Sequence, residues 1–272
     1  RGRPMEAIPY FKENLELTNQ LGDSRRNAQA LINTAYCNRM MGDLKLAEDQ
    51  LQEALVTFRK GSSKIFEETA LLFLCYVYHE YGEYEKCREL SFQIEKLAKE
   101  ARTVFALGSS YERRAMAEYG LGDLEKAKSN IEKARQILSI TFDSFYDTST
   151  VSQALIVWKM EDYDFFRSIC RDLLKSDLKE GNYSCIIPGL EFSAIAVASE
   201  GKYELAAQLF FNAQAIRAEL STPVPSSKEK LFQNLVGNLK KNLREKQFIG
   251  VKNNLIDKQQ LLNLARQVLE NN

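Results

Sequence analysis

Apolar side chains recur along most of the chain at intervals of three and four residues, the spacing that places them on one face of an α-helix. The pattern predicts a first helix over about residues 4–21 and then helical hairpins over about 24–60, 65–101, 103–139, 144–178 and 186–220. A break around Pro223 and Pro225 follows, and three further helices are predicted at about 227–243, 245–252 and 257–270. The sequence therefore predicts an all-α chain.

A two-residue turn separates the helices of each hairpin and recurs at a nearly constant interval. Gly42-Asp43 returns as Gly82-Glu83, Gly122-Asp123, Glu161-Asp162 and Gly201-Lys202, in steps of 40, 40, 39 and 40 residues. Glycine supplies the backbone conformation that a tight turn between antiparallel helices requires. The period predicts a solenoid of repeated hairpins.

Small side chains repeat at fixed distances from each turn. Seven residues before it stand Ala35, Cys75, Ala115, Ala154 and Ala194. Five residues after it stand Ala7, Ala47, Cys87, Ala127 and Ala206, with Phe166 in one repeat. Small residues at both places would let the two helices of a hairpin approach closely.

These positions resemble the pattern of the tetratricopeptide repeat family over residues 2 to about 220. The resemblance implies a right-handed superhelical solenoid, made of half a repeat plus five hairpins over residues 1–221, with a C-terminal helical cap over residues 222–272 packed on it. The period exceeds the usual ~34 residues, so the helices should be longer. The repeat that begins near Phe142 departs from the pattern at Glu161 and Phe166, and its hairpin should be less tightly packed.

The run LFFNAQAIRAEL over residues 209–220, the proline break and the three helices after it resemble the closing segment of the sensor arms of bacterial STAND signalling ATPases of the maltose-regulator type. Asn212 and Phe211 replace residues that are usually Ala and Gly there. The resemblance implies a nucleotide-binding module upstream and an arm that senses a ligand. The alternative is a free-standing scaffold for protein–protein interaction.

The start of the sequence lies at a mid-repeat turn, so the first helix would lack its partner and would expose Ala7, Ile8, Phe11 and Leu15. Because solenoids need capped ends, we expect a fragment of a larger protein, and an open face there would favour self-association through the N-terminal helix.

Composition narrows the range of functions. The 37 basic and 37 acidic side chains balance, which argues against a nucleic-acid or membrane partner. No apolar run approaches the ~18–20 residues that span a bilayer. Five cysteines without a C-x-x-C pair suggest a reducing cytoplasm rather than disulfides or zinc.

Catalytic motifs are missing from the sequence. His79 is the one histidine, and no phosphate-binding loop, nucleophile elbow or dinucleotide fingerprint occurs. We expect no enzyme activity, no cofactor and no metal.

The first helix of each hairpin should line the concave side of the solenoid, where stacked positions form one groove. The large and charged residues there, which predict a groove for a protein, peptide or small-molecule ligand, are Tyr36, Arg39, Tyr76, His79, Glu112, Arg113, Met116, Tyr119, Leu155 and Trp158. For any one of these aromatic residues, packing between neighbouring helices is the competing interpretation.

Overall fold

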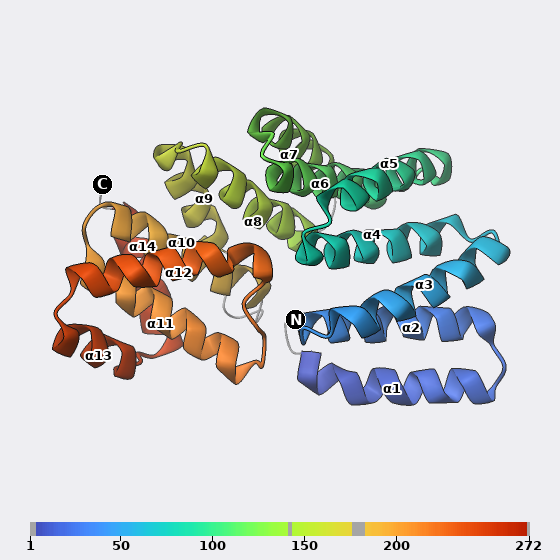
Figure 1. Cartoon of the computed structure of the whole chain (residues 1–272), viewed down its shortest axis with the longest axis horizontal. Coiled ribbons are helices and arrows are strands. Elements are labelled where there is room, and N and C mark those ends of the chain that lie inside the picture. The colour runs from blue at the N-terminus through green and yellow to red at the C-terminus, as the bar shows by residue number, and fades with distance from the viewer. Residues whose placement is uncertain (1–3, 141–142, 176–182, 271–272) are drawn as a thin grey trace. The chain divides into compact units, whose positions relative to one another are not determined.

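The computed structural model describes residues 4–140, 143–175 and 183–270, and within these ranges every regular element is a helix (Figure 1). Two compact units divide inside α8: an N-terminal unit, Arg3–Ser149, and a C-terminal unit, Thr150–Leu220 with Val224–Asn272. The helices are α1 Pro4–Gln20, α2 Ser24–Met40, α3 Leu44–Lys60, α4 Lys64–Tyr81, α5 Tyr84–Ala101, α6 Val104–Leu121, α7 Leu124–Leu138, α8 Asp143–Lys159, α9 Tyr163–Lys175, α10 Tyr183–Ser199, α11 Tyr203–Glu219, α12 Ser226–Asn242, α13 Glu245–Asn253 and α14 Lys258–Glu270.

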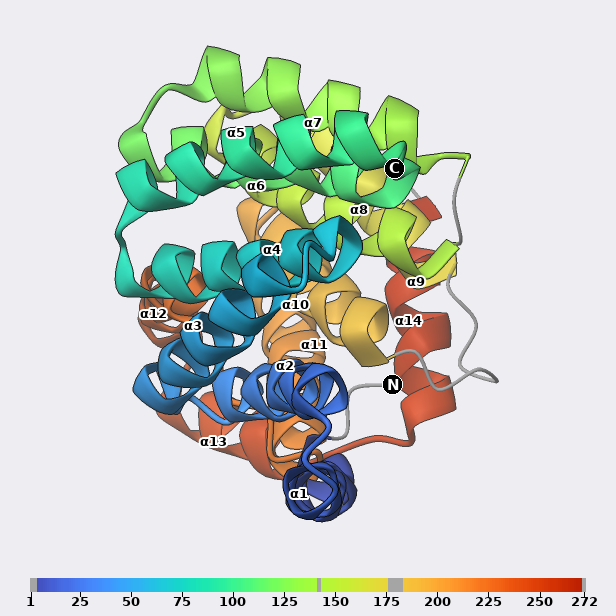
Figure 2. The same ribbon diagram turned by 90° about the vertical axis from the view of Figure 1, so that its right-hand side faces the viewer.

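The N-terminal unit is a stack of antiparallel helices in which each helix packs on the next, as Figure 2 shows for α1 to α7. In addition α2 packs on α4, and α4 on α6. The even-numbered helices therefore form an inner row, which we call the A helices, and α1, α3, α5 and α7 are the B helices. The A helices bury more residues than the B helices because each has neighbours on more sides.

The turns between helices share one backbone conformation. Gly42, Gly82, Gly122 and Gly201 have φ between 78° and 89°, the left-handed region that glycine enters without steric cost. The next residue closes each turn by donating its N–H to the carbonyl five residues earlier, as Asp43 does to Asn38 at 2.9 Å. A Cβ added to Gly42 would meet nothing within 4 Å, so backbone conformation alone favours glycine there.

The acidic residue after the glycine caps the following helix. Asp43 accepts a hydrogen bond from the Leu46 N–H at 3.2 Å, and Asp123 accepts one from the Lys126 N–H at 3.1 Å. Glu83 and Lys202 make no such bond. The recurring Gly-Asp pair therefore ends one helix and begins the next.

The repeated small residues lie where the helices of a hairpin meet. All five of the set that precedes the turns are fully buried, at 0% exposure: Ala35, Cys75, Ala115, Ala154 and Ala194. Ala47, Cys87, Ala127 and Ala206 are equally buried, and Phe166 is 1% exposed. This confirms the packing role that their spacing predicted, except for Ala7 of α1, which is only half-buried.

One position of the C-terminal unit, Phe166, holds a large ring where the α10–α11 hairpin and the N-terminal unit hold a small residue. Phe166 of α9 lies 5.0 Å from the ring of Trp158 and 5.8 Å from that of Phe192 on α10. The turn before it has Glu161 in the left-handed conformation, at φ 62°, with the Asp162 N–H donating to Val157 at 3.3 Å. The predicted looser packing of this hairpin stays a prediction.

The last three helices pack on α9, α10 and α11 within the same unit. Glu191 of α10 is completely buried and accepts hydrogen bonds from Arg217 and Gln214 of α11, at 2.5 and 3.0 Å. Lys228 of α12 lies 3.8 Å from the same carboxylate and 5.0 Å from the Phe192 ring. Burial lowers the pKa of Lys228 to about 8. These charged contacts connect α12 to α10 and α11.

The predicted all-α hairpin architecture is confirmed, and the helix ends in the described ranges agree with the predicted ones to within three residues. The predicted end of one hairpin at residue 178 lies outside the described residues. The proposed boundary between solenoid and cap at residue 221 stays a prediction, and the cap helices share one compact unit with α9–α11.

Candidate functional site

An aromatic and guanidinium cluster crosses the three A helices of the N-terminal unit. We define the Arg–Tyr cluster as Tyr36 and Arg39 on α2, Phe73 and Tyr76 on α4, and Arg113 on α6. Tyr36 and Phe73 have ring centroids 5.5 Å apart, and Phe73 and Tyr76 are 6.2 Å apart. The rings therefore form a continuous row between neighbouring A helices.

Two arginines lie over these rings. The Arg39 guanidinium carbon is 5.7 Å from the Tyr36 centroid and 5.0 Å from that of Tyr76. Arg113 approaches Tyr76 from α6, at 3.8 Å. Such contacts contribute roughly 0.5–2 kcal/mol each, more as the site loses water. Tyr76 is thus held between cations of two different helices.

Each arginine also has a carboxylate partner. Arg39 pairs with Glu80 of α4, and Arg113 pairs with Glu112 beside it on α6. The Arg113 and Glu112 side chains are 4% and 3% exposed, so their charges must be matched inside the protein. The Arg–Tyr cluster and its two glutamates carry no net charge, and what it offers a ligand is ring surface.

Burial governs titration at the cluster. It raises the pKa of the Tyr76 hydroxyl to about 12, although the positive charges of Arg113 and Arg39 act in the other direction. Tyr76 therefore stays protonated and able to donate a hydrogen bond at any physiological pH.

Tyr36 is 38% exposed, which makes it the most accessible ring of the row.

His79 of α4 is 7% exposed, and its ring centroid lies 5.4 Å from that of Tyr84 in an edge-on arrangement. Burial, together with the positive charges of Arg113 and Arg39, lowers its pKa to about 3. Its Nε2 makes no hydrogen bond to a described residue. His79 is therefore a neutral, buried side chain at neutral pH.

The structure brings together some of the ten predicted groove residues and buries others. Tyr36, Arg39, Tyr76 and Arg113 meet in the Arg–Tyr cluster, and Tyr119 is half-buried. Five of the ten are buried, at 2–7% exposure: His79, Glu112, Arg113, Met116 and Leu155. Leu155 and the half-buried Trp158 belong to the C-terminal unit. That these residues contact a ligand stays a prediction.

Two residues of the site were not among those predicted from the sequence. Phe73 lies three residues before Tyr76, and Glu80 lies four after it, so helical spacing alone could have placed both on the Tyr76 face. Phe73 links Tyr36 to Tyr76, and Glu80 holds Arg39.

The described parts of the chain give little support for metal binding, membrane insertion or thiol chemistry. No three His, Cys, Asp or Glu side chains there gather as a metal site, and no helix there could cross a membrane. The Cys75 and Cys87 thiols are buried in the hairpin core and donate to the backbone carbonyls of Cys87 and Arg113, at 3.5 and 3.6 Å. These thiols serve packing.

Together the repeated hairpins and the A-helix row have the arrangement of a tetratricopeptide-like helical repeat fold. The tetratricopeptide repeat family profile matches residues 1–60. No curated protein matches the sequence.

Solved structures with a similar fold have little sequence in common with this chain. The crystal structure of BtubC (BKLC) from P. vanneervenii is similar with a TM-score of 0.58 at 15% identity, over 82% of this chain and 94% of that chain. The apo form of RapI is similar with a TM-score of 0.56 at 16% identity, over 88% of this chain and 93% of that chain. At these identities the likeness establishes the fold.

Proposed function

We propose that the N-terminal unit binds a peptide segment of a partner protein across Tyr36, Phe73 and Tyr76. The observation that carries the proposal is the row of rings across α2 and α4, fixed from both sides by Arg39 and Arg113. Fixed tyrosines offer large amphipathic surfaces at little entropic cost.

The charges at the cluster indicate the chemistry of the ligand. Because Glu80 and Glu112 already neutralise Arg39 and Arg113, an acidic segment would compete with existing ion pairs. A segment with apolar or aromatic side chains gains ring contacts at no such cost.

Selection of binders from a random peptide library tests this function. We expect the wild-type chain to enrich binders, and Tyr36→Ala and Phe73→Ala to weaken the selected peptides by about tenfold or more. Tyr10→Ala is the matched control, since Tyr10 is a 72% exposed tyrosine of α1 outside the cluster. Equal losses in all three variants, or no enrichment by the wild type, would refute the proposal.

The same proposal extends to regulation of a nucleotide-binding module. Its support is the resemblance of residues 209–220 and of the three helices that follow the proline break, which the structure has as α12, α13 and α14. A longer chain that carries an upstream phosphate-binding loop should hydrolyse ATP at a rate that the selected peptide changes. A gene without such a module would favour the free-standing scaffold.

A further inference from the structure

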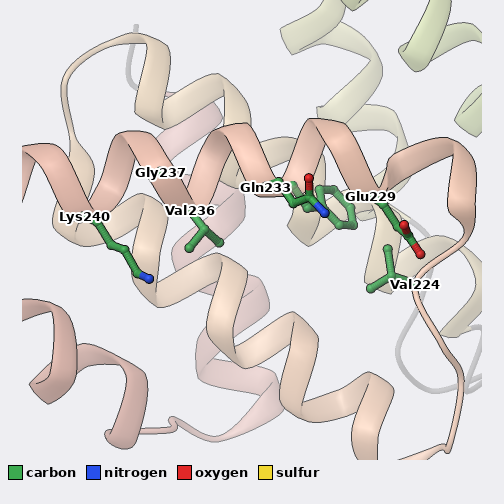
Figure 3. Close-up of a pocket in the computed structure, with 7 residues that line it drawn as sticks. Val224, Glu229, Gln233, Val236, Gly237 and Lys240 are labelled. Atoms are coloured by element: carbon green, nitrogen blue, oxygen red, sulfur yellow. The ribbon is translucent and has the colours of Figure 1, made fainter.

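A shallow apolar groove runs along α12 in the C-terminal unit and has a volume of about 440 Å³ (Figure 3). One stripe of α12 supplies most of its lining: Glu229, Phe232, Gln233, Val236, Gly237 and Lys240. The stripe spans three helical turns, roughly 16 Å. In Figure 3 the side chains of Glu229, Val236 and Lys240 point to the same side of the helix. Glu229, Gln233, Gly237 and Lys240 are exposed.

Gly237 lies in the interior of α12, where glycine costs about 1 kcal/mol relative to alanine. A Cβ at this position would meet no atom within 4 Å. Neither a turn nor crowding inside the chain therefore explains the glycine. A helix surface without a side chain is suited to the close approach of another backbone.

The stripe is complementary to itself when reversed. About its midpoint, between Asn234 and Leu235, Glu229 is the mirror position of Lys240, Phe232 of Gly237, and Gln233 of Val236. Two identical helices that pair antiparallel bring mirror positions together, because a twofold axis matches each residue with its counterpart. Opposite charges would then meet at both ends, with the apolar floor between them.

We propose that α12 pairs antiparallel with α12 of a second copy of this chain. Glu229 then faces Lys240 of the second copy, and Lys240 faces its Glu229. Within the described residues, Glu229 makes no ion pair and Lys240 only approaches the Phe248 ring, at 5.9 Å. Lys230 and Lys241 lie one residue further along, rotated by about 100° around the helix and so outside the stripe.

The contact is small, since one three-turn stripe of each copy takes part. Interfaces of this size support weak association, and a dissociation constant on the order of 100 µM is expected. The second copy occupies a surface of the C-terminal unit and contacts no residue of the Arg–Tyr cluster, so the two proposals are tested by different variants.

Charge reversal with sedimentation equilibrium tests the pairing. Glu229→Lys and Lys240→Glu should each weaken self-association by about tenfold or more, because each places like charges at both ends of the pair. An equimolar mixture of the two variants should associate again, as should the double variant, because both restore opposite charges. Gly237→Leu should block the pair by filling the groove.

Lys241→Glu is the matched control, with the same charge change outside the stripe, and should still associate. Circular dichroism and melting temperature establish that each variant is folded. A wild-type chain that stays monomeric at millimolar concentration would overturn the proposal. So would association that neither reversal weakens, since another face, such as that of α1, would then carry it.

Discussion

The two units contain hairpins of the same kind but differ in the residues at one of the turns. In the N-terminal unit, glycine turns recur and residues such as Ala115 and Ala127 let the helices meet closely. In the C-terminal unit the α10–α11 hairpin keeps Gly201 and Ala206, but at the turn before α9 Glu161 takes the glycine place and Phe166 takes the alanine place. The buried Glu191 of α10 pairs with two cations, Arg217 and Lys228. The hairpin therefore tolerates loss of its usual residues where neighbouring side chains compensate in volume or charge.

Each unit carries its own intrinsic probe, which makes the comparison measurable. Trp158, the one tryptophan, belongs to the C-terminal unit, and His79, the one histidine, to the N-terminal unit. Tryptophan fluorescence and histidine NMR can therefore follow the two units separately.

Removal of the buried carboxylate should have the largest effect. Glu191→Gln leaves Arg217 and Lys228 buried without a counter-charge, and we expect the C-terminal unit to lose about 3–5 kcal/mol of unfolding free energy. Urea unfolding followed by Trp158 fluorescence measures this loss. Glu204→Gln, at an exposed glutamate of α11, is the control. A comparable loss in that control would mean that the ion cluster contributes little.

The residue five positions after the turn should have opposite size requirements in the α8–α9 and α6–α7 hairpins. Phe166→Ala removes a ring that Trp158 and Phe192 contact and should cost about 3 kcal/mol. Ala127→Phe overfills the tight α6–α7 contact and should cost about 1–3 kcal/mol. Denaturant midpoints by circular dichroism test both, and a neutral Phe166→Ala would show that the hairpin does not depend on this ring.

Acidification should destabilise the N-terminal unit through His79. Its pKa is about 3 in the folded chain and ordinarily near 6.5, so the unfolded state binds the proton first. The contribution is complete above pH 6.5 and is lost as the pH falls towards 3, by about 2 kcal/mol at pH 5. His79→Gln should flatten the stability profile between pH 7 and 5. An NMR titration of His79 near pH 6.5 would contradict the expected burial.

Exchange of the turn residues should give the smallest effect, with opposite signs. Glu161→Gly relieves a left-handed non-glycine residue and should stabilise the C-terminal unit by about 0.5–1 kcal/mol. Gly122→Ala should destabilise the N-terminal unit by about 1 kcal/mol through backbone conformation, since its Cβ would meet no atom. Thermal melts of both variants check the pair, and two changes of the same sign would refute this account.

Much of the fold follows from sequence because the determinants are local and repeated. Glycine, aspartate and small residues at fixed spacings specify turn, cap and close contact, and Ala35 and Cys75 lie where they were predicted. The split inside α8 has no local signal, since it depends on contacts distributed over many helices.

The site was accessible to sequence analysis only in part. Stacking of the A helices predicted that Tyr36, Arg39 and Tyr76 would be neighbours, and they are. The pairing of Arg113 with the adjacent Glu112 was not foreseeable, because consecutive helix residues ordinarily point apart. Burial of Met116 and Leu155 likewise depends on tertiary packing that spacing does not encode.

The left-handed turns of the N-terminal unit also recur at a constant interval along the chain. Gly22, Gly42, Ser62, Gly82, Arg102 and Gly122 are spaced by twenty residues each, one per helix. Since each hairpin depends chiefly on its neighbours, a block of forty residues can be excised or duplicated without changing which side chains face inward. The length of such an array is thus free to vary in evolution, in whole hairpins and not in single residues.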